Sequence, residues 1–191
     1  CRGTHVSMLL SRDAHVPRLR IRGDTITPTW KNLQKPNIAY FITSTITNYA
    51  PILIEDKYKD ILLDSLYYYN KKYSYDLVAY VIMPEHIHFI LKGNNEEKLH
   101  QYMREFKTYT SKQILKELIK ENKNNILNVF ASKANGKAKY AVWMQRYRSI
   151  PVYNEKVLKQ KIDYIHRNPL RRGLVDDVRS YKYSSFNLYY K

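Results

Sequence analysis

The stretch that decides the fold is a pair of apolar runs around a short bend: Leu77-Val78-Ala79-Tyr80-Val81-Ile82-Met83, then Pro84-Glu85, then His86-Ile87-His88-Phe89-Ile90-Leu91. Short runs rich in β-branched and aromatic residues predict buried strands, and the bend predicts a hairpin of strands at 76–83 and 87–92. Side chains two apart in a strand project to one face, roughly 7 Å apart along the backbone. His86 and His88 are therefore expected side by side, with Ile87 pointing into a core.

The segments around this hairpin predict the rest of the fold. We expect a strand at 38–46, helices over 55–69, 96–122 and 154–168, and one or two strands within 140–153. Pro169 is expected to end the last helix, and residues 122–139, rich in lysine and asparagine, are expected to form a flexible loop. The order β-α-β-β-α-β-α predicts an α+β fold, the ferredoxin-like split βαβ arrangement, with helices on one side of an antiparallel sheet.

Length and charge limit the class of protein. The chain has 191 residues, which fits one domain, and we assign residues 35–191 to it. Residues 1–34 lack a hydrophobic period and carry scattered arginines, which predicts a basic, partly disordered extension. The chain has 33 Lys and Arg against 17 Asp and Glu, a net charge of +16. This excess favours a polyanionic partner, nucleic acid before an acidic membrane.

Cysteine use and hydropathy indicate where the protein works. Cys1 is the single cysteine, so no internal disulfide framework is expected. The sequence has no apolar run of about 18 residues, so no transmembrane helix and no membrane partner are expected. Both observations predict a cytoplasmic location.

Four residues suggest the chemistry. Tyr164 and Asn168 lie four apart on the predicted last helix, so they share a face about one turn apart. This helix, docked over the sheet, would bring them beside His86 and His88. Two imidazoles and one amide oxygen make a mixed site with open positions, which suits Mg²⁺ or Mn²⁺ bound with phosphate oxygens better than a closed zinc site.

A tyrosine beside such a cation predicts phosphoryl transfer. The cation polarises a phosphate, and the phenolate of Tyr164 is a competent nucleophile that gives a covalent phosphotyrosine. The phenol needs the metal or neighbouring cations, with Arg167 and Lys161 as candidates, to favour its ionised form. Each signal is weak by itself, because paired histidines and tyrosines are common as packing residues. The combination is what indicates a site.

Two segments of the chain resemble a known family. The segment Val81–Leu91 is similar to the signature of the HUH single-strand transposases that use one catalytic tyrosine. The segment Tyr164–Val175 and the ending Tyr181-Lys182-Tyr183-Ser184-Ser185 resemble the REP-associated tyrosine transposase branch of that superfamily. The similarity extends over roughly residues 36–186 and leaves residues 1–34 outside it.

The resemblance implies a complete reaction. It implies that His86 and His88 hold a divalent metal, with Asn168 at the position of the third ligand. It implies that Tyr164 attacks single-stranded DNA beside a short hairpin of the repetitive extragenic palindrome type, leaving a 5′-phosphotyrosine and a free 3′-hydroxyl. A bacterial, nucleoid-associated enzyme is expected, acting as a monomer or a homodimer.

Alternatives remain at this point. Tyr109, among cations on the long helix, is a rival nucleophile for which we favour a structural or DNA-contacting role. The chain is alternatively a retired transposase that binds DNA hairpins without cutting them, or a phosphoesterase that uses the His-x-His pair without a tyrosine. The presence of both histidines, the tyrosine and the asparagine argues against retirement.

DNA contacts are predicted where cations and aromatic residues alternate, because this pattern suits phosphate contacts and base stacking on single strands. Trp143, Arg146, Tyr147 and Arg148 form such a cluster before the last predicted helix. The complete set of predicted DNA-binding residues is Arg104, Lys107, Lys112, Trp143, Arg146, Arg148, Arg167, Arg171 and Arg172.

Overall fold

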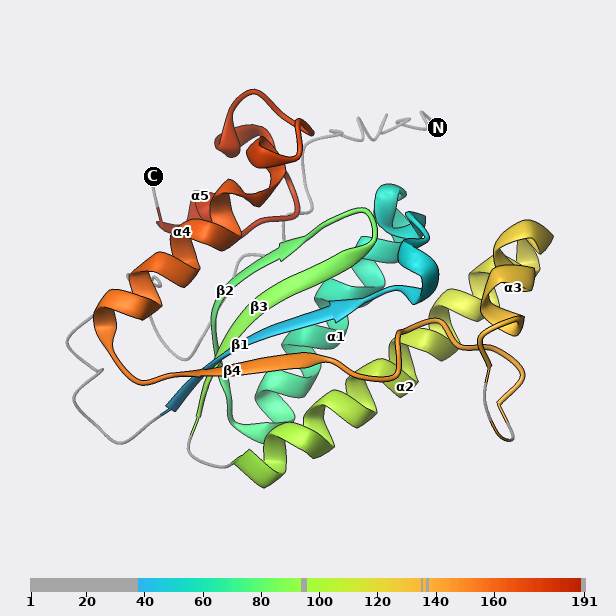
Figure 1. The fold of residues 1–191 in the computed structure, drawn as a ribbon, viewed down its shortest axis with the longest axis horizontal. Coiled ribbons are helices and arrows are strands. Elements are labelled where there is room, and N and C mark those ends of the chain that lie inside the picture. The colour runs from blue at the N-terminus through green and yellow to red at the C-terminus, as the bar shows by residue number, and fades with distance from the viewer. Residues whose placement is uncertain (1–37, 94–95, 135, 137, 190–191) are drawn as a thin grey trace, which may run out of the picture.

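A computed structural model describes residues 38–93, 96–134, 136 and 138–189, and its sheet has the predicted ferredoxin-like topology. The strands are β1 (Ile38–Thr45), β2 (Asp76–Ile82), β3 (His86–Gly93) and β4 (Arg148–Val152). They lie in the order β2-β3-β1-β4, and every neighbouring pair is antiparallel (Figure 1). The split βαβ prediction is therefore confirmed, with β3 between β1 and β2. The predicted extension at residues 1–34 lies outside the described residues.

The helices are α1 (Asp56–Tyr73), α2 (Glu96–Lys120), α3 (Asn124–Ala131), α4 (Glu155–Arg171) and the short α5 (Phe186–Tyr189). Three single 3-10 turns occur within the described residues: Thr47–Tyr49 and Ile52–Ile54 lie between β1 and α1, and Val178–Ser180 lies between α4 and α5. Residues 122–139 were predicted to form a flexible loop, but part of this segment is helix α3, so the prediction was wrong for that part. Leu127 and Phe130 of α3 are buried against the core, and this contact stabilises a helix too short to be detected by its period.

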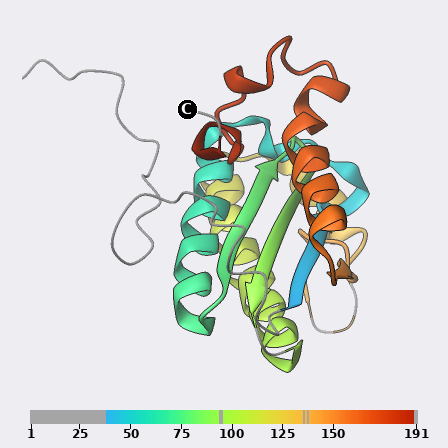
Figure 2. The same ribbon diagram turned by 90° about the vertical axis from the view of Figure 1, so that its left-hand side faces the viewer.

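Helices cover both faces of the sheet, which corrects the expectation that they lie on one side. Figure 2 shows α1 and α4 on opposite sides of the strands. Phe89 belongs to a large core cluster with α1 and α2, whereas Phe41 packs in a smaller cluster under Ile162 and Ile165 of α4. The physical reason is that the central strands are apolar on both faces, so each face needs a cover.

Helix α4 continues through Pro169, although the proline was expected to end it. Its last turn closes with Gly173 at φ 63°, where the Gly173 amide donates to Leu170 O (3.0 Å) and the Leu174 amide donates to Pro169 O (2.9 Å). These two bonds form a Schellman motif, in which glycine adopts the left-handed conformation at low cost. The helix begins at the side chain of Asn154, which accepts from the amide of Val157 at 2.9 Å.

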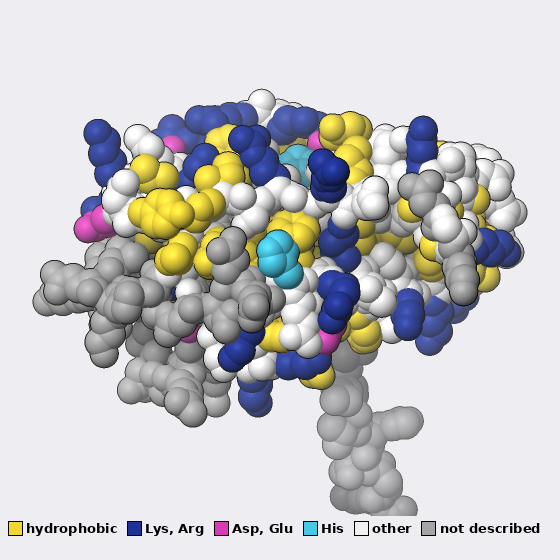
Figure 3. Space-filling model, turned by 60° about the horizontal axis from the view of Figure 1, so that its bottom comes forward, with side chains coloured by type: hydrophobic (Ala, Val, Ile, Leu, Met, Phe, Trp, Pro, Cys, Tyr) yellow, Lys and Arg dark blue, Asp and Glu magenta, His cyan; other side chains and the backbone are white. Residues whose placement is uncertain are grey.

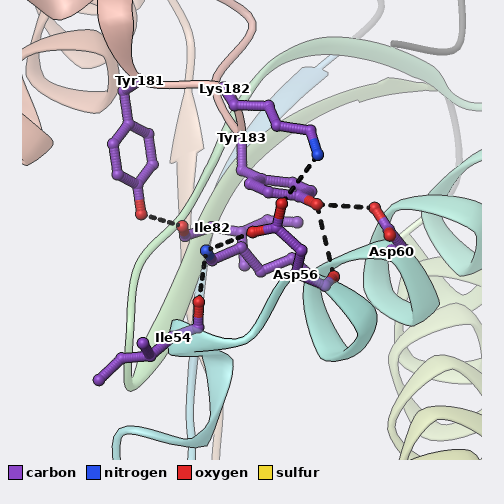
Figure 4. Close-up of polar contacts among 8 residues, drawn as sticks. Ile54, Asp56, Asp60, Ile82, Tyr181, Lys182 and Tyr183 are labelled. Atoms are coloured by element: carbon purple, nitrogen blue, oxygen red, sulfur yellow. Dashed lines mark hydrogen bonds and ion pairs between the residues drawn. The ribbon is translucent and has the colours of Figure 1, made fainter. Parts of the chain in front are cut away.

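The chain after α4 returns to the free edge of β2. The Ile82 amide donates to Tyr183 O (2.9 Å), and the Ser185 amide donates to Tyr80 O (3.0 Å). Figure 4 shows Tyr183 reaching α1, where its hydroxyl donates to Asp60 Oδ1 at 2.9 Å. This C-terminal segment, residues 181–185, therefore ties the sheet edge to α1 and covers an otherwise open strand.

Candidate active site

The two predicted histidines meet at the start of β3. Their Nε2 atoms lie 3.0 Å apart, and both rings are largely buried. Glu85 Oε1 lies 3.2 Å from His86 Nδ1, and Thr43 Oγ1 on the neighbouring strand β1 lies 2.8 Å from His88 Nδ1. Because a carboxylate only accepts hydrogen bonds, His86 donates its Nδ1–H and keeps a lone pair on Nε2. Two ring nitrogens thus face one point from a rigid strand.

Burial keeps both rings neutral. Desolvation, with smaller contributions from His86 and Lys161, lowers the pKa of His88 to about 3. Desolvation also lowers the pKa of His86, against the opposing effect of the Glu85 carboxylate. Neutral imidazoles near pH 7 have free lone pairs, which is the state that binds a metal.

The spacing of the pair fits a cation. Two ligands at about 2.1 Å from one ion and at right angles to each other lie about 3.0 Å apart, as in octahedral coordination. The described residues contain no group of three or more His, Cys, Asp and Glu that would hold a metal. A third ligand from these residues would therefore be another side chain or main-chain oxygen, which is compatible with the amide predicted from Asn168.

Tyr164 lies next to this histidine pair. Its ring centroid is 5.4 Å from that of His88 and 5.9 Å from that of Phe41, both in edge-on arrangements. The residue keeps 36% of its surface exposed, so Tyr164 is partly open to solvent. The expected convergence of a tyrosine from the last helix and the histidines from the hairpin is therefore present in the structure.

Two cations flank the Tyr164 ring. Lys161 Nζ lies 6.0 Å from the ring centroid and also covers Phe41 at 4.9 Å. Arg171 Cζ lies 5.5 Å from the same Tyr164 centroid, although the sequence suggested Arg167 for this role. Arg167 instead forms an exposed ion pair with Asp163 at 2.7 Å. The cations beside the phenol are thus Lys161 and Arg171.

Asn168 is buried on α4, one helical turn after Tyr164, with 6% of its surface exposed. A buried amide needs partners for its polar atoms, which is compatible with a ligand role. Its assignment as a metal ligand stays a prediction.

Six of the nine predicted DNA-binding residues separate into two groups. Trp143 is buried and donates from Nε1 to Thr110 Oγ1 (2.9 Å), and Lys107 Nζ donates to the carbonyls of Met144 (2.7 Å) and Gln145 (3.0 Å). Both side chains hold the chain before β4 against α2, which gives them a structural role. The exposed cations Arg104, Lys112, Arg146 and Arg148 stay predicted DNA contacts.

The rival Tyr109 lies away from the histidines. It is on α2, whose core contacts are with the opposite face of the sheet, and its ring centroid is 6.5 Å from that of Tyr69. The residues that the sequence did not identify are Thr43 and Glu85. Glu85 had a visible signal, because an acidic residue directly precedes the His-x-His pair.

Comparisons with known proteins agree with this geometry. The family of IS200-like transposases matches residues 36–168. A protein of Haemophilus influenzae named as a REP-associated tyrosine transposase is 27% identical over 147 residues, 71% of this chain and 77% of that protein. The solved structure of a REP-associated tyrosine transposase bound to a REP hairpin shares the fold, with a TM-score of 0.60 and 21% identity over 78% of this chain and 76% of that one. The chain therefore belongs to the IS200-like transposase family, whose members are enzymes that cleave and transfer DNA strands.

Proposed function

We propose that this chain cleaves and rejoins single-stranded DNA beside a hairpin through a 5′-phosphotyrosine on Tyr164. The observation that carries the proposal is the contact between the Tyr164 ring and the His88 ring, 5.4 Å between centroids. This contact brings a nucleophile and a candidate metal site to one point. A hairpin substrate is supported by the likeness to the REP-associated relatives.

The reaction is an in-line exchange at phosphorus. The Tyr164 oxygen attacks phosphorus, the bond from phosphorus to the 3′ oxygen breaks, and the phenol loses its proton to solvent while the leaving 3′ oxygen gains one and becomes a hydroxyl. Lys161 and Arg171 lie where they offset negative charge on the phosphate and on the phenol oxygen. Attack by a 3′-hydroxyl on the phosphotyrosine then releases the phenol and rejoins the strand.

HUH transposases use a divalent metal, and the residues of this site fit one. We propose that His86, His88 and Asn168 hold Mg²⁺ or Mn²⁺, since two neutral imidazoles and an amide oxygen leave positions for phosphate oxygens. The bound cation would withdraw electron density from the phosphate and offset charge in the transition state. Thr43 and Glu85 orient the two rings from their Nδ1 sides.

The surface charge supports a DNA partner. On the face drawn in Figure 3, Lys and Arg side chains far outnumber Asp and Glu. Such a surface attracts the phosphate backbone and makes binding fall steeply with salt. No helix among the described residues has the length and apolar character to cross a membrane. We propose a bacterial cytoplasmic location, because the proposed DNA substrate is found there.

A labelling experiment tests the proposal. A 5′-phosphotyrosine retains the DNA on the 3′ side of the cut, so hairpin oligonucleotides labelled at the 3′ end should give a labelled protein on a denaturing gel. The same oligonucleotides labelled at the 5′ end should instead release a fragment with an extendable 3′-hydroxyl. The pool should vary the stem and the flanking single strands, and Mg²⁺, Mn²⁺ and a chelator should be compared.

The matched variants are Tyr164→Phe and Tyr109→Phe. Tyr164→Phe should lower adduct formation by at least about a thousandfold, because it removes the phenol whose ring contacts His88, and it should leave hairpin binding intact. Tyr109→Phe should behave as the wild type. An adduct that survives in Tyr164→Phe contradicts the assignment, and binding without any adduct in the wild type supports a retired, DNA-binding protein.

A further inference from the structure

Glu85 occupies a rigid turn between β2 and β3. Its carbonyl accepts from the Ile46 amide at 2.8 Å, and the carbonyl of the preceding Pro84 accepts from the Leu53 amide at 2.9 Å. The Glu85 residue is 7% exposed. A carboxylate held this deeply by its own main chain needs partners for its charge.

One oxygen of Glu85 has two partners from different parts of the site. Oε1 accepts from Arg172 Nη2 at 2.7 Å and lies 3.2 Å from His86 Nδ1. These two partners, His86 and Arg172, lie 86 positions apart in the sequence. A single buried atom therefore joins the histidine pair to the chain end of α4.

Arg172 is well placed to transmit this contact to the helix. It is the residue that caps α4, four positions after Asn168 and eight after Tyr164, and its amide donates to Asn168 O at 3.1 Å. The Schellman turn at Gly173 fixes the backbone just after it. A cation at the C-terminal end of a helix also interacts favourably with the helix dipole. The ion pair between Glu85 and Arg172 therefore also restrains the last turn of α4.

We propose that Glu85 and Arg172 form a positioning pair that sets the distance between the metal histidines and the Tyr164 nucleophile. Glu85 holds His86 in the tautomer that presents Nε2, and Arg172 holds the end of α4 against the same carboxylate. This inference rests on the proposed function, because it assigns roles relative to Tyr164 and the metal. Because Arg172 binds Glu85 in this proposal, we no longer expect Arg172 to contact DNA.

The pair differs from an ordinary surface ion pair in its environment. The Glu85 side chain is 9% exposed and the Arg172 side chain 57%, so one charge is buried while the other closes over it. Arg179 and Asp177 form a pair of the same length, 2.7 Å, but both side chains are exposed. Arg179→Met is therefore the matched control, since it removes an arginine from an ion pair outside the site.

The first test is Arg172→Met. Adduct formation measured in a single turnover, at saturating Mn²⁺ and DNA, should fall about tenfold or more, because small errors in the position of a nucleophile are costly. The affinities for Mn²⁺ and for the hairpin should stay within about threefold of the wild type. Arg172→Lys, which restores a cation, should recover part of the rate, and Arg179→Met should match the wild type.

The second test is Glu85→Gln, which weakens the contact with both partners. Mn²⁺ affinity, measured by electron paramagnetic resonance without DNA, should fall about tenfold or more, because removing an outer hydrogen-bond partner of a ligating histidine costs that much. Excess Mn²⁺ should restore occupancy but not the full single-turnover rate, since Arg172 has lost its charged partner.

A third measurement separates this inference from the proposed function. Hydrogen exchange of the amides at 170–174, without DNA or metal, should be about tenfold faster in Arg172→Met and unchanged in Arg179→Met. This readout needs no catalysis, so it stands even if no adduct forms. Unchanged exchange together with an unchanged saturating rate overturns the proposal. Weaker hairpin binding with a normal saturating rate also overturns it, because Arg172 would then be a DNA contact.

Discussion

The two faces of the sheet use the same strands for different purposes. The face under α1 and α2 carries a large aromatic core, in which Tyr102 and Phe106 are fully buried. The face under α4 has a smaller apolar cluster and, at one end, His88 beside Tyr164. Successive side chains of β3 point to opposite faces of the sheet. Ile87 and Phe89 therefore belong to the large core, whereas His88 between them points to the α4 face.

This difference indicates how the protein combines stability with a polar site. The α1–α2 face supplies most of the apolar burial, so the α4 face can hold imidazoles, a carboxylate and a phenol at low cost to the fold. The turn that carries Glu85 and His86 is held by main-chain bonds to the segment after β1. We therefore expect changes on the first face to act on stability and changes on the second to act on chemistry.

The largest stability effect is expected for Phe106→Ala on the α1–α2 face. Its ring packs 6.1 Å from Phe89 and 6.2 Å from Trp143 between centroids, so the truncation leaves a cavity. The free energy of unfolding in urea should fall by about 3–5 kcal/mol. Ile162→Val on the α4 face is the comparison, at about 0.5–1.5 kcal/mol. A cost for Phe106→Ala below that of Ile162→Val would contradict the division between the faces.

Acid should act mainly through the α4 side, where the buried histidines lie. Burial lowers the pKa of His166 on α4 to about 4, against about 6.5 in an unfolded chain. Between these values the unfolded state binds the extra proton, so stability falls as the pH falls from 6.5 toward 4, by about 3 kcal/mol for this residue.

His166→Gln isolates this effect. Urea titrations at several pH values in that window give the slope of the unfolding free energy against pH. In this variant the slope should be smaller than in the wild type by about 1.4 kcal/mol per pH unit. An unchanged slope in His166→Gln would show that the ring titrates normally in the folded protein.

Much of the fold was predictable from local pattern. The strands β1, β2 and β3 begin and end within about two residues of their predicted bounds, since their apolar runs are continuous. The same continuity in Leu77–Met83 indicates burial on both faces, which agrees with helices on both sides of the sheet and not on one. The end of α4 is set by Gly173, whose φ is positive, and not by Pro169.

The convergence of the candidate site residues was predictable, and the contacts that support the histidine rings were less so. His86, His88 and Tyr164 converge as expected, because spacing on a strand and on a helix is local information. Thr43 lies 45 positions from His88, and their contact depends on the register of β1 against β3. No single-sequence pattern contains that register, so the contact between Thr43 and His88 is visible only in the folded protein.

Thr43→Val tests how the proposed metal site is supported, with a smaller expected effect. The variant keeps the shape of the side chain but removes the hydroxyl that lies 2.8 Å from His88 Nδ1. Mn²⁺ affinity should fall about tenfold, roughly 1.4 kcal/mol, with little change in unfolding free energy. Thr108→Val, at an exposed position on α2, should change neither quantity. Equal Mn²⁺ affinities in the two variants would remove Thr43 from the site.

The smallest effect is expected for an exposed ion pair between the C-terminal segment and α1. Lys182 Nζ lies 2.8 Å from Asp56 Oδ2 on α1, and both side chains are about half exposed (Figure 4). Because such pairs are screened by water and salt, Lys182→Met should lower the unfolding free energy by less than about 1 kcal/mol, and less at high salt. The neighbouring Tyr183 is buried and donates to Asp60, so Tyr183→Phe should cost about 1–3 kcal/mol by removing a hydrogen bond to a charged group. A larger loss in Lys182→Met than in Tyr183→Phe would mean that charge, rather than burial, holds the C-terminal segment to α1.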